Sequence, residues 1–207
     1  QKLPMVFDIS KGESGLRNAI DELCHRAEES VDSGVNYIIL SDRDIDAGHA
    51  AIPSLLAVSS VHHYLISVQK RVQTALIVES GEIREVMHAE LLLGYGASAI
   101  CPYMTFAVLD RLVREHKIQE EYATAEANYI KAVDKGLKKI MSKMGISTIR
   151  SYRGAKIFEA IGVSEEVLKR YFGTEISTIG GIGLRDIAKD AIRLHDEGFN
   201  YREGDFL

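Results

Sequence analysis

Apolar positions along the chain alternate between helical spacing and short, continuous runs. From Leu16 to Val31 an apolar residue recurs every three or four positions, which predicts a helix that Gly34 ends. Val35–Leu40 is a β-branched apolar run that stops at polar residues, as a buried strand does. The same reasoning predicts helices at 53–70, 83–93, 106–115, 121–144, 165–171 and 184–197, strands at 74–78, 98–101 and 146–149, and a loop at 173–183.

This alternation of strands and helices predicts an α/β fold. Continuous apolar strands separated by helices are typical of a parallel sheet with crossover helices on both faces. The βα units recur at irregular intervals, which resembles part of a (β/α) barrel, and a helix-rich C-terminal part follows. We expect two parts: an α/β segment at residues 1–173, and a glycine-containing linker with a helix at 174–207.

Composition narrows the class of protein. The 207 residues are 46% hydrophobic, and their net charge of -5 is spread along the chain, which argues against nucleic acid as a partner. Cys24 and Cys101 are too few for a disulfide framework, so a reducing, cytoplasmic setting is expected. The uncharged stretch 91–109 is interrupted by two glycines and a proline, which argues against a membrane span. The chain starts at Gln1 without a secretory signal and is interpreted as part of a longer protein.

Polar side chains follow the predicted strands and form the main candidate site. In parallel sheets the loops after the strands surround a common opening, so these groups are expected to converge. An arginine beside a carboxylate there could bind a substrate or support proton transfer, whereas the favoured interpretation is ion pairs that brace the loops. The candidate residues are Asp42, Arg43, Glu79, Glu82, Arg84, Tyr103, Arg150 and Arg153.

Other candidates carry weaker signals. The neighbouring His62 and His63 point about a quarter-turn apart on a helix, so together they cannot chelate one metal ion, and no H-E-x-x-H spacing occurs. The run 180–183 could bind an anion at a helix N-terminus, but a mobile or tightly turned linker is favoured. Cys101 could be a nucleophile, although Pro102 follows it and a buried, inert cysteine is the default.

Several stretches, in order over nearly the whole chain, resemble the central domain of glutamate synthase large subunits. They are Ile39–Arg43, Ile77–Val86, Leu92–Ala97, Ala99–Tyr103, Asn128–Val133, Lys143–Thr148, Ser151–Ala160 and Ile179–Leu184. The resemblance implies a parent oxidoreductase that takes the amide nitrogen of glutamine, channels ammonia and forms glutamate from 2-oxoglutarate. It implies FMN and an iron–sulfur cluster for that parent, with neither bound by this segment.

The resemblance also implies partners and a role. The amidotransferase domain would lie upstream and the FMN-binding domain downstream in the same polypeptide, with ferredoxin or a pyridine-nucleotide-dependent small subunit as the electron donor. The segment would join and orient these domains without catalysis of its own, in the cytoplasm or, in a photosynthetic eukaryote, the plastid stroma. Two alternatives stay open: a small stand-alone barrel-like enzyme with an anion site at the strand ends, and an interaction module with a large exposed apolar patch.

Overall fold

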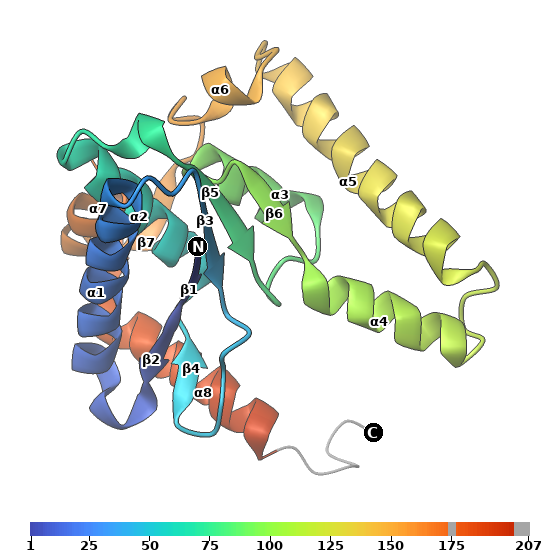
Figure 1. Ribbon diagram of the computed structural model, residues 1–207, viewed down its shortest axis with the longest axis horizontal. Helices are drawn as coiled ribbons and strands as arrows, with labels where there is room; N and C mark the ends of the chain where they lie inside the picture. The colour runs from blue at the N-terminus through green and yellow to red at the C-terminus, as the bar shows by residue number, and fades with distance from the viewer. Residues whose placement is uncertain (174–176, 201–207) are drawn as a thin grey trace.

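The computed structural model describes residues 1–173 and 177–200, in which helices surround a small central sheet (Figure 1). The strands are β1 (Lys2–Pro4), β2 (Val6–Asp8), β3 (Tyr37–Ser41), β4 (His49–Ala51), β5 (Ala75–Glu79), β6 (Ala99–Cys101), β7 (Ala160–Val163) and β8 (Ser177–Ile182). The helices are α1 (Gly12–Asp32), α2 (Ser54–Ser67), α3 (Val86–Gly94), α4 (Tyr103–Arg114), α5 (Tyr122–Lys143), α6 (Ile149–Tyr152), α7 (Glu165–Tyr171) and α8 (Leu184–Phe199). Short 3-10 turns span Ile9–Lys11 and Arg71–Gln73.

The main sheet has the order β1-β3-β5-β6, and all its strand pairs are parallel. Helices α1, α2 and α3 make the crossovers between its strands, as the alternating pattern predicts. Ile38 and Leu40 of β3 and Leu76 and Val78 of β5 lie on one face of the sheet and are fully buried, whereas Ile39 and Ile77 on the other face are only half-buried. The predicted α/β class with a parallel sheet is confirmed.

The N-terminal lead-in forms two strands that the apolar pattern did not reveal. β1 pairs with β3, and β2 pairs with β4 in a separate antiparallel ladder with Phe7 opposite Ala50. Each of these strands has three residues, which is too short for a periodic signal. Leu3, Met5 and Phe7 are nonetheless buried, so the lead-in belongs to the core.

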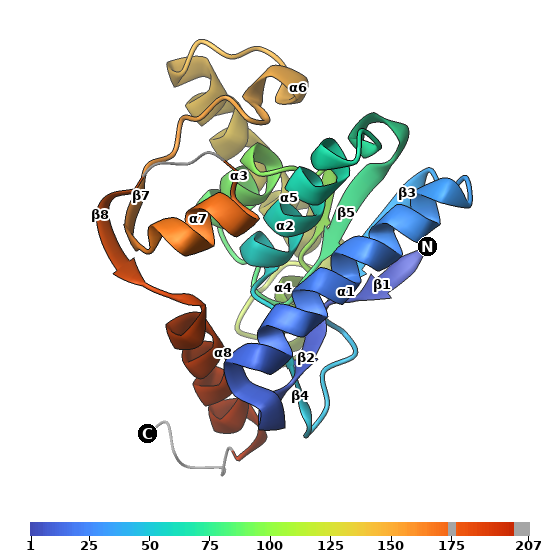
Figure 2. The ribbon, with the colours of Figure 1, turned by 90° about the vertical axis from the view of Figure 1, so that its left-hand side faces the viewer.

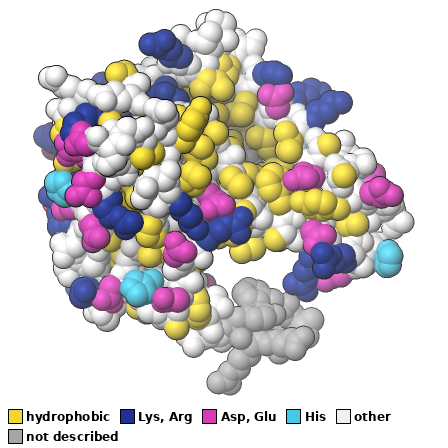
Figure 3. Space-filling view, viewed as in Figure 1, with side chains coloured by type: hydrophobic (Ala, Val, Ile, Leu, Met, Phe, Trp, Pro, Cys, Tyr) yellow, Lys and Arg dark blue, Asp and Glu magenta, His cyan; other side chains and the backbone are white. Residues whose placement is uncertain are grey.

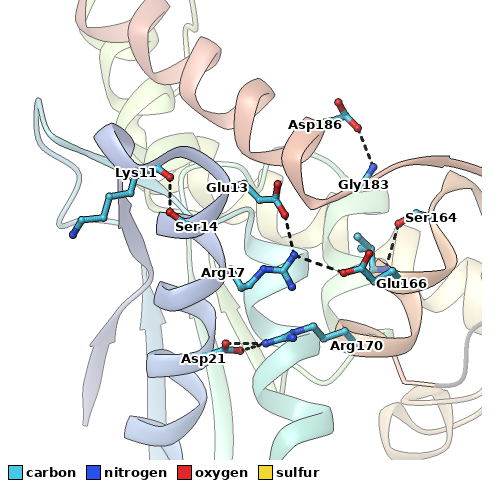
Figure 4. Close-up of polar contacts among 11 residues, drawn as sticks. Lys11, Glu13, Ser14, Arg17, Asp21, Ser164, Glu166, Arg170, Gly183 and Asp186 are labelled. Atoms are coloured by element: carbon cyan, nitrogen blue, oxygen red, sulfur yellow. Dashed lines mark hydrogen bonds and ion pairs between the residues drawn. The ribbon is translucent and has the colours of Figure 1, made fainter.

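Helices α1, α2 and α7 lie together on one side of the molecule, and α8 crosses below them (Figure 2). Polar contacts fasten α7 to α1 (Figure 4): Arg170 reaches both carboxylate oxygens of Asp21 at 2.8 and 3.0 Å. Arg17 binds Glu13 on its own helix at 2.9 Å and lies 3.6 Å from Glu166 of α7. The C-terminal elements are therefore held against the sheet-covering helices by side chains as well as by packing.

The expected loop at 173–183 is wrong for most of its described part, because β8 occupies Ser177–Ile182 and pairs in parallel with β7. Residues 174–176 of that prediction lie outside the described residues. In the sequence the glycines indicate a loop, but the pairing of β8 with β7 requires glycine. A Cβ on Gly181 would lie 2.1 Å from the carbonyl oxygen of Gly162 on β7. The C-terminal part is helix-rich, as predicted, and also contains this parallel strand pair.

The predicted strand at 146–149 is wrong as well. Gly145, with φ +69°, follows the end of α5, and the short helix α6 begins at Ile149. Thr148 caps α6 by accepting a hydrogen bond from the backbone N–H of Ser151 at 3.3 Å. The apolar residues of this stretch therefore lie in a turn and a helical start. The predicted helix 165–171 is confirmed, and the Ser164 side chain caps it.

Helices α4 and α5 form an arm that stands away from the sheet (Figure 1). No residue of α4 is fully buried, and Ala125 is the one buried residue of α5. The stretch 91–109 divides into the end of α3, the strand β6 and the start of α4. Among the described residues, every helix is too short or too polar to cross a membrane.

Candidate functional site

Strands β3, β5 and β6 bring polar residues together at their carboxyl ends. Ser41 closes β3, Glu79 closes β5, and Tyr103 begins the helix that follows β6. Backbone bonds tie the three loops to each other, since Asp42 N–H donates to the Glu79 carbonyl and Ser80 N–H to the Cys101 carbonyl. We call Ser41, Asp42, Arg43, Glu79, Ser80 and Tyr103 the strand-end cluster.

Glu79 is the centre of one half of this cluster. Its carboxylate accepts a hydrogen bond from Ser41 Oγ at 2.6 Å and one from Arg43 Nε at 2.7 Å. Partial burial would raise the pKa of Glu79, but these two bonds outweigh it and hold the pKa below its ordinary value. The Arg43 guanidinium also lies 3.9 Å from the centre of the Tyr103 ring, within the range of a cation–π contact.

Asp42 is the centre of the other half and is almost fully buried. Its Oδ2 accepts hydrogen bonds from Ser80 Oγ at 2.6 Å and from the Gly81 N–H at 2.9 Å. Its Oδ1 is buried without a hydrogen-bond partner among the described residues. Burial, followed by the Asp42 carboxylate nearby, raises the pKa of Tyr103, so this phenol stays protonated at neutral pH.

One acidic and one basic candidate follow β5 and lie beside the strand-end cluster. Glu82 Oε2 accepts hydrogen bonds from the backbone N–H and the Oγ of Ser54 at 2.7 and 2.5 Å. An acceptor at this point satisfies a free N–H group at the start of α2. Arg84 is exposed and shares the wall of a hollow of about 250 Å³ with Glu82 and His88.

The remaining arginine candidates lie elsewhere. Arg153 donates to the Ala97 carbonyl at 2.9 Å and lies 3.3 Å from Ser98 Oγ, just before β6 begins. This is the opposite end of the strand from Tyr103 and the strand-end cluster. Arg150 is exposed on α6. The structure therefore does not join Asp42, Glu79 and Arg153 in one pocket, an arrangement that would have favoured the alternative of a stand-alone enzyme.

The glycine run and the cysteines offer little to a bound ligand. At the N-terminus of α8, the Gly183 N–H already donates to the Asp186 carboxylate at 3.0 Å, and that negative charge disfavours an anion. Cys101 is half-buried, and burial together with the Glu79 charge raises the pKa of its thiol, which disfavours the nucleophilic thiolate. Within the described ranges, no group of three or more histidine, cysteine or acidic side chains is placed to hold a metal ion.

Sequence reasoning missed a buried polar group at the other end of the sheet. Arg71 is nearly fully buried and donates to His62 Nδ1 at 2.8 Å and to the carbonyls of Thr74 and Gly96 at 2.7 Å each. Burial and then the neighbouring Arg71 charge lower the pKa of His62 to about 3, so this imidazole is neutral and accepts. No local signal could have found it, because the group closes only when Gly96, which has φ +128° and lies 25 positions from Arg71, packs against the His62 ring.

Most of this chain is similar in sequence to known proteins. Residues 1–164 match the family described as glutamate synthase central domain. The chain is 42% identical over 199 residues to the glutamate synthase [NADPH] large chain of Bacillus subtilis, covering 96% of this chain and 13% of that one. It is 38% identical over 213 residues to the chloroplastic ferredoxin-dependent glutamate synthase of Spinacia oleracea, covering 97% and 13%.

A third relative matches over a similar part of this chain, and a solved structure aligns with a smaller part. The glutamate synthase [NADH] of Schizosaccharomyces pombe is 42% identical over 201 residues, which are 95% of this chain and 9% of that one. The chain therefore spans about a tenth of the length of the curated relatives it matches. The flavin-binding domain of baker's yeast flavocytochrome b2 aligns with a TM-score of 0.51 at 15% identity, covering 77% of this chain and 40% of that one, which shows a similar fold alone.

Proposed function

Because this chain belongs to the glutamate synthase central domain family, we propose that it is a structural and coupling segment of a glutamate synthase. In this proposal it connects the glutamine amidotransferase domain with the FMN-binding synthase domain, so that ammonia passes between two active sites at fixed positions. Ammonia released into solution would be diluted and protonated, whereas a rigid connection preserves the geometry of a shielded route. The segment itself performs no catalysis.

The strand-end cluster is the observation that carries this proposal. Enzymes with (β/α) barrels place their reactive groups at this end of the strands. Here Glu79 is held by Ser41 and Arg43, and Asp42 by Ser80 and the Gly81 N–H. Carboxylates already bonded to their own chain stiffen the loops and offer little to a substrate, which supports a bracing role for the cluster.

The residues present do not fit the cofactors of the parent enzyme. An iron–sulfur cluster is held by four cysteines as a rule, and this chain has two. One of them, Cys24, is buried on α1, where burial raises its pKa to about 12 and disfavours a metal-binding thiolate. The N-terminus of α8 carries the Asp186 carboxylate where a flavin phosphate would need a donor. We therefore assign FMN and the iron–sulfur cluster to other parts of the polypeptide.

Within this proposal, residues 1–173 form the α/β segment, and residues 174–207 connect it to the FMN-binding domain. The partners are the amidotransferase and FMN-binding domains of the same polypeptide, with a pyridine-nucleotide-dependent small subunit or ferredoxin as the electron source. Relatives named for NADPH, NADH and ferredoxin are all similar to this chain, so its sequence is compatible with each donor. We propose a cytoplasmic location, or the plastid stroma in a photosynthetic eukaryote, since one relative is named as chloroplastic.

The test is a binding and turnover measurement on the purified 207-residue chain. We expect no saturable binding of FMN up to about 1 mM, an affinity limit of roughly 4 kcal/mol, and no release of ammonia from glutamine. The parent polypeptide that contains this segment serves as the positive control for both assays. Tight binding of one FMN per chain, or glutamine hydrolysis by the isolated chain, would overturn the proposal.

A further inference from the structure

The main sheet ends in one unprotected edge. Among the described residues, no strand pairs with the side of β6 that faces away from β5. Edge strands in native proteins usually carry charged residues or prolines that prevent pairing with other chains. The opposite edge strand β1 has both, Lys2 and Pro4, whereas Ala99–Cys101 of β6 has neither. The β6 edge therefore has the composition of a strand that is covered in the working protein.

Helix α4, which follows β6, also has an uncovered apolar face. Met104 and Val108 of α4 are spaced four residues apart, so they lie on one face, and their exposed fractions are 47% and 48%. Ala99 is exposed, and Ile100 and Cys101 are half-buried, although Val78, which pairs with Ile100, is fully buried. Figure 3 shows hydrophobic side chains gathered along the concave side between the sheet and the α4–α5 arm. We call β6 with the Met104–Val108 face the β6–α4 surface.

We propose that the β6–α4 surface is a docking site for an extended segment of the parent polypeptide that lies outside these 207 residues. An open backbone edge is satisfied by another strand, because only a strand supplies N–H and C=O groups at the required spacing. An apolar helix face beside that edge requires apolar side chains from the same partner. The proposal rests on the proposed function, in which the chain is one part of a much longer polypeptide.

The length of the related chains identifies this occupant. The matched segment is 13% of the Bacillus subtilis relative and 9% of the Schizosaccharomyces pombe relative, so most of those polypeptides lies outside the matched region. A segment tethered to the same polypeptide is present at a high effective concentration, so a short edge and a few side chains are enough to hold it. A second copy of this chain has no such advantage.

The test measures amide hydrogen exchange in the parent polypeptide. We expect the β6 amides that face away from β5 to exchange at least roughly 100-fold more slowly than in an unstructured peptide of the same sequence, since the amides paired with β5 are protected without a docked segment. Val108→Glu places a charge in the docking site and should accelerate exchange there at least 10-fold by displacing the segment. The matched control Val72→Glu introduces the same charge at a 91% exposed valine in another part of the chain and should change nothing at β6.

The outcomes separate this inference from the proposed function. Unprotected β6 amides in the wild-type polypeptide, or equal effects of Val108→Glu and Val72→Glu, would refute the docking site. Protection that depends on protein concentration, with Val108→Glu converting a dimer to a monomer in sedimentation, would show a second copy as the occupant and also refute it. Glutamine-dependent glutamate formation by the wild-type polypeptide decides the proposed function independently, whichever exchange result is obtained.

Discussion

The neutral, buried His62 predicts a specific acid sensitivity of the fold. His62 Nδ1 accepts a hydrogen bond from the buried Arg71, so a proton at that nitrogen would break the bond and place two cations together. His63 on the same helix and Arg153, which follows α6, add further repulsion. The pKa of His62 is therefore lowered from 6.5 to about 3, with burial as the largest cause.

The direction and the magnitude of the change in stability with pH follow from proton linkage. The unfolded chain binds a proton at this histidine below pH 6.5, and the folded chain does so only below about pH 3. Stability from this group is complete above pH 6.5 and is lost as the pH falls toward 3. One pKa unit corresponds to about 1.4 kcal/mol, so between pH 6.5 and pH 4 the loss from His62 alone is about 3 kcal/mol.

Urea unfolding at a series of pH values tests this prediction. His62→Gln keeps an oxygen that can accept from Arg71 but has no titratable ring, so it should escape the loss. We expect the wild type to lose about 3 kcal/mol more than His62→Gln between pH 6.5 and pH 4, because the carboxylates common to both proteins cancel in the difference. His88→Gln, a histidine away from Arg71, should follow the wild type. Parallel pH curves for the wild type and His62→Gln would refute the reasoning.

Three further predictions concern stability and can be read from urea midpoints at constant m-value. Gly181→Ala should cost at least about 2 kcal/mol because its methyl group meets the backbone of β7, whereas Gly180→Ala faces open space and should leave the strand pair intact. Asp42→Ala should cost about 2–4 kcal/mol because two donors lose their acceptor, and Asp42→Asn, which keeps an acceptor oxygen, should cost less; equal losses would contradict this. A double-mutant cycle on Asp21 and Arg170 should give a coupling below about 1 kcal/mol, since both side chains are more than 40% exposed; a coupling above about 2 kcal/mol would show that solvent screens this pair poorly.

The sequence could predict what local patterns and parallel topology determine. The strands after Gly34 and before Glu79 are apolar runs ended by polar residues, and the structure has them within two residues of the expected bounds. The meeting of Asp42 with the loop after Glu79 follows from topology, since parallel neighbouring strands end at one edge. The Ser164 cap could also be predicted, because its signal lies within four residues.

What could not be predicted depends on contacts between distant segments. Arg153 follows the long helix α5 and a glycine turn, and no local pattern tells at which end of β6 that path returns. Arg71 has the appearance of a surface cation after a helix, and its burial depends on the Gly96 carbonyl, 25 positions away. In the sequence alone, Gly181 indicates a flexible loop. In the structure it belongs to a closely paired strand, because the backbone of Gly162 lies against it.

The distribution of buried residues supports a division of labour within the segment. One face of the central strands is fully buried and their ends are tied by the strand-end cluster, so this part of the molecule can hold a fixed geometry. The α4–α5 arm has one buried residue, Ala125, and it is held to the rest of the molecule mainly where Gly136 of α5 packs against Val86 of α3. Under the proposed coupling role a misplacement of about 1 Å between active sites would be costly, so the position of the arm matters. The segment that we propose at the β6–α4 surface would contact α4 and add to the contacts that fix the arm on the rigid core.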